Sequence, residues 1–269
     1  MKNIDFFLNK SKELRKVLFN KFYLTNGGHP GSVFSLLDSM VALYYGDFLN
    51  KDNKNNSILD KVIISKGHAA SVLYPILVDM GVLNKNEFDN WGNKESILKI
   101  FSNISIPGID ATSGSLGHGL GIGAGYALSF KKRNINKNVY VVISEGELYE
   151  GSIWESLLFI NHYQLTNLKI LLDRNNLMIL GNTEDCLKLN PIDEKLKSFG
   201  CKVTTIDGHN YNELLSSFDI ISKDNNNINC IILNTVKGKG VKMFENKAFW
   251  HYWQPITDEE RNIINNELS

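Results

Sequence analysis

Two stretches of the chain decide its fold: residues 141–151 read VVISEGELYEG, and residues 171–177 read LLDRNNL. Each begins with a nearly continuous apolar run, which is typical of a strand covered on both faces. The first run ends at Glu145 and Gly146, and the second ends close to Asn175. Runs of the same kind predict five strands, at 61–65, 138–144, 168–173, 202–206 and 229–235.

Apolar residues recur at helical spacing between and before these runs. They predict helices at 5–25, 33–49, 120–132, 152–164 and 193–199. The alternation predicts an α/β protein, with a doubly wound, mostly parallel sheet and helices on both faces. One domain is expected over residues 1–255, with a loosely held tail at 256–269. The Asn-rich pieces at 49–56 and 224–229 are expected to be surface loops.

The composition is that of an ordinary globular protein. Of 269 residues, 43% are hydrophobic and 22% charged, and Lys+Arg and Asp+Glu balance at 29 each, so no net charge favours nucleic acid. Neither a secretory signal nor a bilayer-spanning segment is evident. Cys186, Cys201 and Cys230 form no C-x-x-C pair, so reduced, mostly packed thiols are expected. We expect a cytoplasmic protein without membrane or nucleic-acid partners.

The polar residues that follow two of the strands suit a divalent metal. Ligands of such sheets bind at the carboxyl ends of the strands, where Glu145 and Asn175 are expected to face each other. A carboxylate and an amide oxygen suit Mg²⁺, which completes its coordination with phosphate oxygens and water. A helix beginning near Gly151 adds a positive N-terminus toward the same phosphates. An acidic turn after a strand is also common in purely structural loops, so the pair alone leaves both interpretations open.

Together, several motifs resemble the N-terminal half of the transketolase family. The segment from Glu145-Gly146 to Asn175 is similar to the metal and diphosphate signature of thiamine diphosphate enzymes. The remaining motifs follow the family's order within residues 20–255: Gly28-His29-Pro30-Gly31, Ser65-Lys66-Gly67-His68, Pro107-Gly108-Ile109-Asp110, Gly114-Ser115-Leu116-Gly117-His118-Gly119, residues 151–155, Asp207-Gly208-His209, Lys237-Gly238-Lys239-Gly240 and Trp250-His251.

This resemblance implies a site for thiamine diphosphate and Mg²⁺, with Ca²⁺ or Mn²⁺ as alternatives. It gives the metal to Glu145, Asn175 and the Leu177 carbonyl. It places the cofactor against His68, Gly114, Leu116, Gly146, Glu150, Asn175 and Ile179. It implies catalytic, proton-transferring roles for His29, His68 and His251. Three other histidines are expected to be structural or surface residues: His118, His162 and His209.

Three positions depart from the family pattern. Glu145 stands where Asp is usual, and its extra methylene changes the geometry offered to magnesium. Phe101 stands where the family has a histidine that helps to recognise the ketose donor, and Leu180 replaces an acid. These departures leave room for a specialised sugar pathway.

The resemblance implies the N-terminal subunit of a split transketolase, which moves a two-carbon ketol unit from a ketose to an aldose, as sugars or sugar phosphates. It implies a separate C-terminal subunit, together with self-association of N-terminal subunits near Glu150 and Glu155, giving a heterotetramer. Two alternatives stay open. One is another thiamine diphosphate-dependent synthase that forms carbon–carbon bonds, and the other is a non-catalytic scaffold with a degenerate site.

Overall fold

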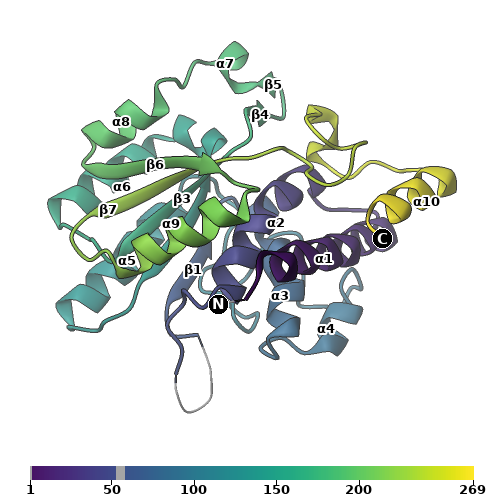
Figure 1. Cartoon of the computed structure of the whole chain (residues 1–269), viewed down its shortest axis with the longest axis horizontal. Coiled ribbons are helices and arrows are strands. Elements are labelled where there is room, and N and C mark those ends of the chain that lie inside the picture. The colour runs from purple at the N-terminus through teal and green to yellow at the C-terminus, as the bar shows by residue number, and fades with distance from the viewer. Residues whose placement is uncertain (1, 53–57) are drawn as a thin grey trace.

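The computed structural model describes residues 2–52 and 58–269. Within them, five parallel strands form the central sheet in the order β1-β2-β3-β7-β6 (Figure 1). The strands are β1 (Lys61–Ile64), β2 (Val139–Ser144), β3 (Leu168–Arg174), β6 (Cys201–Asp207) and β7 (Ile228–Asn234). The five predicted strands are therefore confirmed, with each end displaced by at most one residue.

The strand order brings four loops to one edge of the sheet. The chain lays down β1, β2 and β3 side by side, passes to β6 at the far edge, and returns to place β7 between β3 and β6. Because all five strands are parallel, their carboxyl ends share one edge. The residues that follow four of them therefore lie together: Ser65, Glu145, Asn175 and Thr235.

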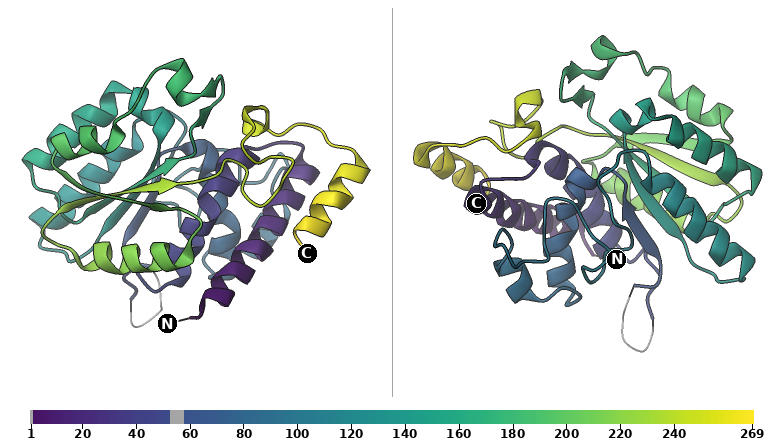
Figure 2. Two further views of the ribbon diagram at one scale, coloured as in Figure 1. Left: turned by 45° about the horizontal axis from the view of Figure 1, so that its top comes forward. Right: turned by 180° about the vertical axis from the view of Figure 1, so that it is seen from behind.

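Helices cover both faces of the sheet, as predicted (Figure 2). Side chains alternate along β2, so that Tyr140 and Val142 join one buried cluster, whereas Val141 and Ile143 join the other. The first cluster includes residues from α1 (Ile4–Thr25), α2 (Pro30–Tyr45), α3 (Leu73–Asp79) and α9 (Tyr211–Lys223). The second includes residues from α5 (Gly119–Lys132), α6 (Gly151–His162) and α8 (Ile192–Ser198).

Shorter elements, which the sequence pattern did not predict, shape the loops. A two-stranded antiparallel hairpin pairs β4 with β5 beyond the end of β3. The short elements are η1 (Gly67–Val72), α4 (Lys85–Asp89), η2 (Glu145–Tyr149), β4 (Leu177–Met178), β5 (Gly181–Asn182), α7 (Thr183–Cys186) and η3 (Ala248–His251). Helix α2 begins at Pro30, earlier than predicted, because proline has the backbone angle that a first helical residue needs.

The prediction of a loosely held tail is wrong. Helix α10 (Asp258–Glu267) begins with a capping box in which the side chains of Thr257 and Glu260 each accept the other's main-chain N–H. Ile264 is fully buried, and the Tyr23 hydroxyl on α1 donates to Asp258 at 3.0 Å. The tail therefore packs against α1, because its apolar residues find a surface that the sequence pattern did not reveal.

Other expectations have mixed outcomes. Residues 53–57 of the first Asn-rich piece lie outside the described residues. The second piece is only partly a loop, since β7 begins at Ile228 and Asn229 is buried. The cysteines are free, with Cys201 and Cys230 buried and Cys186 exposed, as predicted. Over the described ranges, every helix is too short or too polar to cross a membrane.

One buried carboxylate ties the strand ends together. Asp173, near the end of β3, accepts hydrogen bonds from Ser35 Oγ at 2.7 Å, from Thr235 Oγ1 and from the Lys66 ammonium. These donors belong to α2, to the residue after β7 and to the loop after β1. Burial disfavours the charged carboxylate, but Lys66 and the two hydroxyls outweigh it and keep the pKa of Asp173 below its usual value. One ionised group therefore joins four segments.

We expect Asp173→Asn to lower the free energy of unfolding by about 3–5 kcal/mol, because it leaves the Lys66 ammonium buried without its counter-charge. Urea denaturation measures this change. Asp193→Asn, which removes an exposed ion pair with Lys197, is the control and should cost far less, because water screens that pair. Equal losses in the two variants would contradict the central role of Asp173.

Candidate active site

A cavity of about 430 Å³ opens at the carboxyl ends of the strands. Its lining comes from α2, from the loops after β1, β2 and β3, from the β4–β5 hairpin and from η3. It includes these residues singled out from the sequence: His29, His68, Gly114, Leu116, Glu145, Gly146, Asn175, Leu177, Ile179 and His251. Folding therefore brings together predicted site residues that are far apart along the chain. Glu150, which was also expected to contact the cofactor, does not line the cavity.

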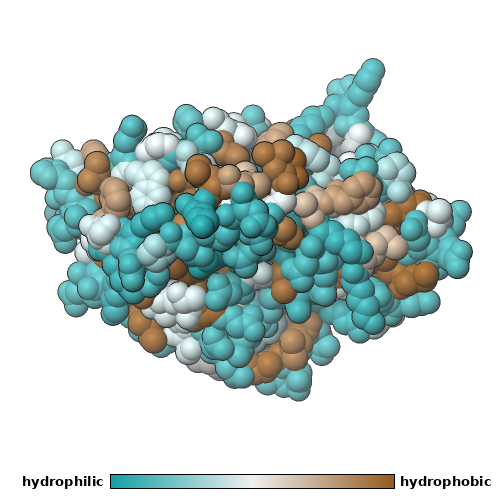
Figure 3. Space-filling model, turned by 90° about the horizontal axis from the view of Figure 1, so that it is seen from above, coloured by the Kyte–Doolittle hydropathy of each residue, from teal (hydrophilic) through white to brown (hydrophobic). Residues whose placement is uncertain are grey.

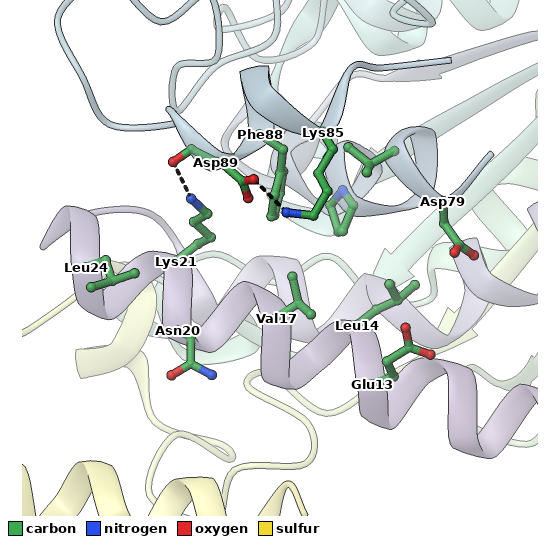
Figure 4. Close-up of a pocket in the computed structure, with 12 residues that line it drawn as sticks. Glu13, Leu14, Val17, Asn20, Lys21, Leu24, Asp79, Lys85, Phe88 and Asp89 are labelled. Carbon is green, nitrogen blue, oxygen red and sulfur yellow. Dashed lines mark hydrogen bonds and ion pairs between the residues drawn. The ribbon is translucent and has the colours of Figure 1, made fainter. Parts of the chain in front are cut away.

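A second cavity, of about 450 Å³, lies between α1 and the α3–α4 segment (Figure 4). Leu14, Val17 and Phe88 contribute apolar walls. Its two lysines already have partners, because Lys85 Nζ lies 2.6 Å from Asp89 Oδ2 and Lys21 Nζ donates to the Asp89 carbonyl at 2.8 Å. This groove is remote from the strand ends, so we place the reactive site in the cavity at the edge of the sheet.

Glu145 lies at the centre of the expected metal site. It is only 3% exposed, and its Oε2 accepts a long hydrogen bond of 3.4 Å from Thr183 Oγ1. Its Oε1 is buried and has no hydrogen-bond partner in the described structure. Burial, and then the charge of Asp173, raise the pKa of Glu145 to about 7. A buried carboxylate oxygen without a donor is costly, so this position suits either a proton or a cation.

The neighbouring oxygens match a hard cation. Asn175 is buried and lines the same cavity as Glu145. Its Oδ1 accepts a hydrogen bond from the Leu177 N–H at 3.2 Å. Carboxylate, amide and main-chain carbonyl oxygens are the ligands that Mg²⁺ prefers. Among the described residues, no group of three or more His, Cys, Asp or Glu side chains is placed to hold a metal. The local residues thus fit an ion that takes its other ligands from phosphate and water.

Lys237 is a cavity residue whose role the sequence pattern did not reveal. It is 1% exposed, and its Nζ lies 3.2 Å from Nδ1 of His251. Burial, and then the charge of Lys66, lower its pKa to about 8. Gly146 lines the same cavity and leaves open space there, since an added Cβ would meet only Ser144 Oγ at 3.9 Å. A buried ammonium beside open space suits an anionic ligand, and the Lys-Gly-Lys-Gly motif was the signal available in the sequence.

Three histidine rings meet in the cavity. The ring centroids of His29, His68 and His251 lie 5.3, 5.4 and 5.5 Å apart in pairs. Burial, and then the charge of Lys237, lower the pKa of His29 to about 4 and that of His251 to about 3. Burial and the Lys66 charge lower the pKa of His68 as well. The rings are therefore neutral near pH 7, and a neutral imidazole can both accept and donate a hydrogen bond.

An aromatic wall flanks the histidines. The rings of Tyr252 and Phe101 lie 4.9 and 6.1 Å from the His29 ring. Phe101 also faces Gly114, where an added Cβ would lie 3.9 Å from its ring. Gly114 has a φ of +150°, a conformation that side chains disfavour. Phe101, at the position where the resemblance leads one to expect a histidine, therefore presents an apolar surface to the cavity.

Glu147, for which the sequence predicted no separate role, supports the Gly114–Gly119 loop. It is fully buried and accepts from the main-chain N–H groups of Gly117 at 2.9 Å and Ser144 at 2.8 Å, and from Ser65 Oγ at 2.5 Å. One carboxylate therefore connects the ends of β1 and β2 to the loop that carries Gly114 and Leu116.

The remaining predicted residues lie elsewhere. Glu150 and Glu155 are exposed at the beginning and on the surface of α6. His118 and His162 are also exposed, whereas His209 is partly buried and makes hydrogen bonds with Asp38 and the Val236 N–H. The expected contacts of Glu150 and Glu155 with a second subunit stay predictions.

The chain matches the family model described as "Transketolase, thiamine diphosphate binding domain" over residues 10–268. It is 34% identical to an apulose-4-phosphate transketolase subunit of Phocaeicola vulgatus, covering 95% of this chain and 91% of that protein. It is 30% identical to a 6-deoxy-6-sulfo-D-fructose transketolase subunit of Clostridium sp., covering 93% and 92% respectively.

Known structures agree with this sequence similarity. A transketolase from Campylobacter jejuni superposes with a TM-score of 0.88 at 25% sequence identity, covering 99% of this chain and 43% of that chain. This chain thus spans less than half the length of that transketolase. The fold, the family model and the relatives agree, and the chain belongs to the transketolase family, as its thiamine diphosphate-binding domain.

Proposed function

We propose that this chain is one subunit of a two-chain transketolase, which binds Mg²⁺ and thiamine diphosphate and transfers a two-carbon ketol unit from a ketose to an aldose. The observation that carries the proposal is a single cavity that holds an unpartnered Glu145 oxygen, the buried Lys237 ammonium and three neutral histidines. Relatives named as transketolase subunits, which match along nearly their whole length, support the two-chain arrangement.

Each part of the cavity has a proposed role in holding the cofactor. Glu145, Asn175 and the Leu177 carbonyl bind Mg²⁺, with Ca²⁺ or Mn²⁺ as substitutes. The Lys237 ammonium neutralises part of the charge of the diphosphate, which approaches the open space at Gly146, and the neutral His68 ring can donate a hydrogen bond to it. The apolar side chains of Leu116 and Ile179, with Gly114, contact the rings of thiamine.

When bound, thiamine diphosphate supplies the electron sink for breaking the carbon–carbon bond beside a ketose carbonyl. The protein's own part is to orient the sugar and to move protons at its hydroxyls. His29, His68 and His251 suit this part because they are neutral, and Nδ1 of His29 has no hydrogen-bond partner in the described structure. Phe101 cannot form a hydrogen bond with a sugar hydroxyl, as the expected histidine could. The ketose donor is therefore recognised by other groups, which supports a role in a specialised sugar pathway.

Exposed apolar side chains around the cavity support a covering partner. Leu180 is 80% exposed, Phe249 66% and Tyr252 48%. The β4–β5 hairpin lies at the top of Figure 1, and on that face, seen in Figure 3, hydrophobic residues gather near the middle. Clustered apolar surface marks protein interfaces. The proposed occupant is a separate C-terminal chain, and self-association through Glu150 and Glu155 completes a cytoplasmic heterotetramer.

The direct test combines this chain with a chain that carries the rest of a transketolase. We expect ketol transfer from ketose donors to appear only when both chains, thiamine diphosphate and Mg²⁺ are present, measured by product analysis. Products formed from pyruvate and an aldehyde, without ketol transfer, would favour a synthase instead. Absence of both reactions, together with absence of cofactor binding, would favour a scaffold.

Thermal shift measures cofactor binding separately from turnover. Thiamine diphosphate with Mg²⁺ at about 100 times its dissociation constant should stabilise the two-chain complex by about 2.7 kcal/mol. Lys237→Met should weaken this affinity about 10- to 100-fold, because it removes a charged partner of the diphosphate. Lys239→Met, in the same loop but outside this cavity, is the control and should bind like the unaltered protein. Equal binding by both variants would remove Lys237 from the site.

Acid should destabilise the cofactor-free chain through its neutral histidines. Between pH 6.5, the ordinary histidine pKa, and about pH 4, His29 is protonated in the unfolded chain and neutral in the folded chain. The unfolded state then binds more protons, so the free energy of unfolding falls as pH falls through this window and is fully retained above it. His29→Gln should lower the number of protons taken up on unfolding by about one, and so reduce the slope of the free energy of unfolding against pH. Urea denaturation at several pH values measures this slope. An unchanged slope would show that His29 is not held neutral.

A further inference from the structure

Behind the candidate active site, three buried side chains form a continuous hydrogen-bonded series. Arg15 Nη2 on α1 donates to Asp38 Oδ1 on α2 at 2.7 Å, and Nδ1 of His209 lies 2.7 Å from Asp38 Oδ2. The other ring nitrogen of His209, Nε2, accepts the main-chain N–H of Val236 at 2.9 Å. The three side chains are each less than a tenth exposed, so water competes little for these contacts.

The contact with Val236 fixes the tautomer of His209. A ring nitrogen that accepts a hydrogen bond carries no proton, so the proton of the neutral ring is on Nδ1 and is donated to Asp38. Burial disfavours ionisation of Asp38, but Arg15 and His209 outweigh it and hold the pKa of this carboxyl well below its usual range. Asp38 therefore only accepts, and donors converge on it from both sides: Arg15 donates from one side, and on the other side the Val236 N–H donates to His209, which in turn donates to Asp38.

The segment 235–240 links this series to the cavity. Val236 directly precedes Lys237, whose ammonium lies in the cavity wall. At the other end of the segment, Gly240 lies against Arg15, since an added Cβ would come within 2.6 Å of Arg15 Cδ. Arg15 therefore supports the segment twice, by direct packing at Gly240 and through Asp38 and His209 at Val236.

We propose that Arg15, Asp38 and His209 form a positioning relay that holds the main chain at Val236 and so sets the Lys237 ammonium in the cavity. The relay touches neither substrate nor cofactor. The hydrogen bond of Lys237 in the described structure goes to a neutral ring, that of His251, so no ion pair anchors the ammonium. Its place depends on the backbone instead. The importance of the relay for binding rests on the proposed function, because Lys237 is there the partner of a diphosphate.

Two substitutions of His209 separate its two contacts. His209→Asn retains a donor near the position of Nδ1, for Asp38, but loses the acceptor for the Val236 N–H. In His209→Gln, the longer side chain places its amide near the position of Nε2. Its oxygen can still accept the Val236 N–H, but the donor to Asp38 is lost. The relay therefore predicts a larger effect on Lys237 for the Asn variant than for the Gln variant, although both remove the imidazole.

The readout is the rate at which acetic anhydride modifies Lys237 in the full chain, followed by peptide mass spectrometry. In His209→Asn we expect Lys237 to react about tenfold faster, because an unsatisfied buried N–H favours local opening of its segment. In His209→Gln the rate should stay within about twofold of the unaltered protein. Lys169 is the internal control, because it is fully buried near the opposite end of β3 and reports general unfolding.

Three results would overturn the relay. These are an unchanged Lys237 rate in His209→Asn, equal acceleration of Lys237 and Lys169, or the same acceleration in the Gln and Asn variants. Titration of the two-chain complex with thiamine diphosphate and Mg²⁺ supplies a second readout, in which only the Asn variant should lose affinity. If the unaltered complex binds no thiamine diphosphate, the proposed function fails, but the labelling comparison still decides the relay.

Discussion

The site depends on the Asp173 carboxylate. This group lies at the end of a central strand and accepts hydrogen bonds from α2, from the loop after β1 and from the residue after β7. A buried charge is stable only where its partners are held in place, so the same contacts that keep Asp173 ionised also fix three loops relative to one another. The loops that carry His68, Asn175 and Lys237 all begin at this point.

Around this anchor, the distribution of charge explains the chemistry of the cavity. Lys66 forms an ion pair with Asp173, whereas among the described residues neither Glu145 nor Lys237 has an ion-pair partner in direct contact. A divalent cation and a diphosphate bound together would satisfy both, the cation at Glu145 and the anion at Lys237. The same lysine charges disfavour protonation of the nearby histidines. In the proposed function, cofactor binding and proton transfer would therefore depend on one electrostatic arrangement.

The departures from the family pattern fall on two different parts of this arrangement. At the proposed metal position, Glu145 has a longer side chain than the Asp expected from the family pattern, but it keeps a carboxylate that is buried. Phe101 leaves the charges untouched and replaces a hydrogen-bonding group by an apolar wall next to His29. In the proposed function the first change would bear on the metal and the second on the sugar, so an altered substrate choice would not require a lost cofactor site.

The sequence by itself determined the strands, the alternation with helices and the family. Each depends on local pattern: apolar runs long enough for a strand, and motifs such as Lys66-Gly67-His68 and Glu145-Gly146 directly after them. These features also predicted which residues would meet at the sheet edge, since parallel strands place their carboxyl ends together.

Only the tertiary structure decided the support of that site and the place of the tail. Glu147, Lys237 and the Arg15–Asp38–His209 series acquire their roles from partners far away in sequence, and no periodicity marks such pairs. The helix at Asp258–Glu267 is stable because Ile264 finds the surface of α1, which local propensity does not encode. Long-range contacts of this kind arise when the chain closes on itself, and a linear pattern carries no record of them.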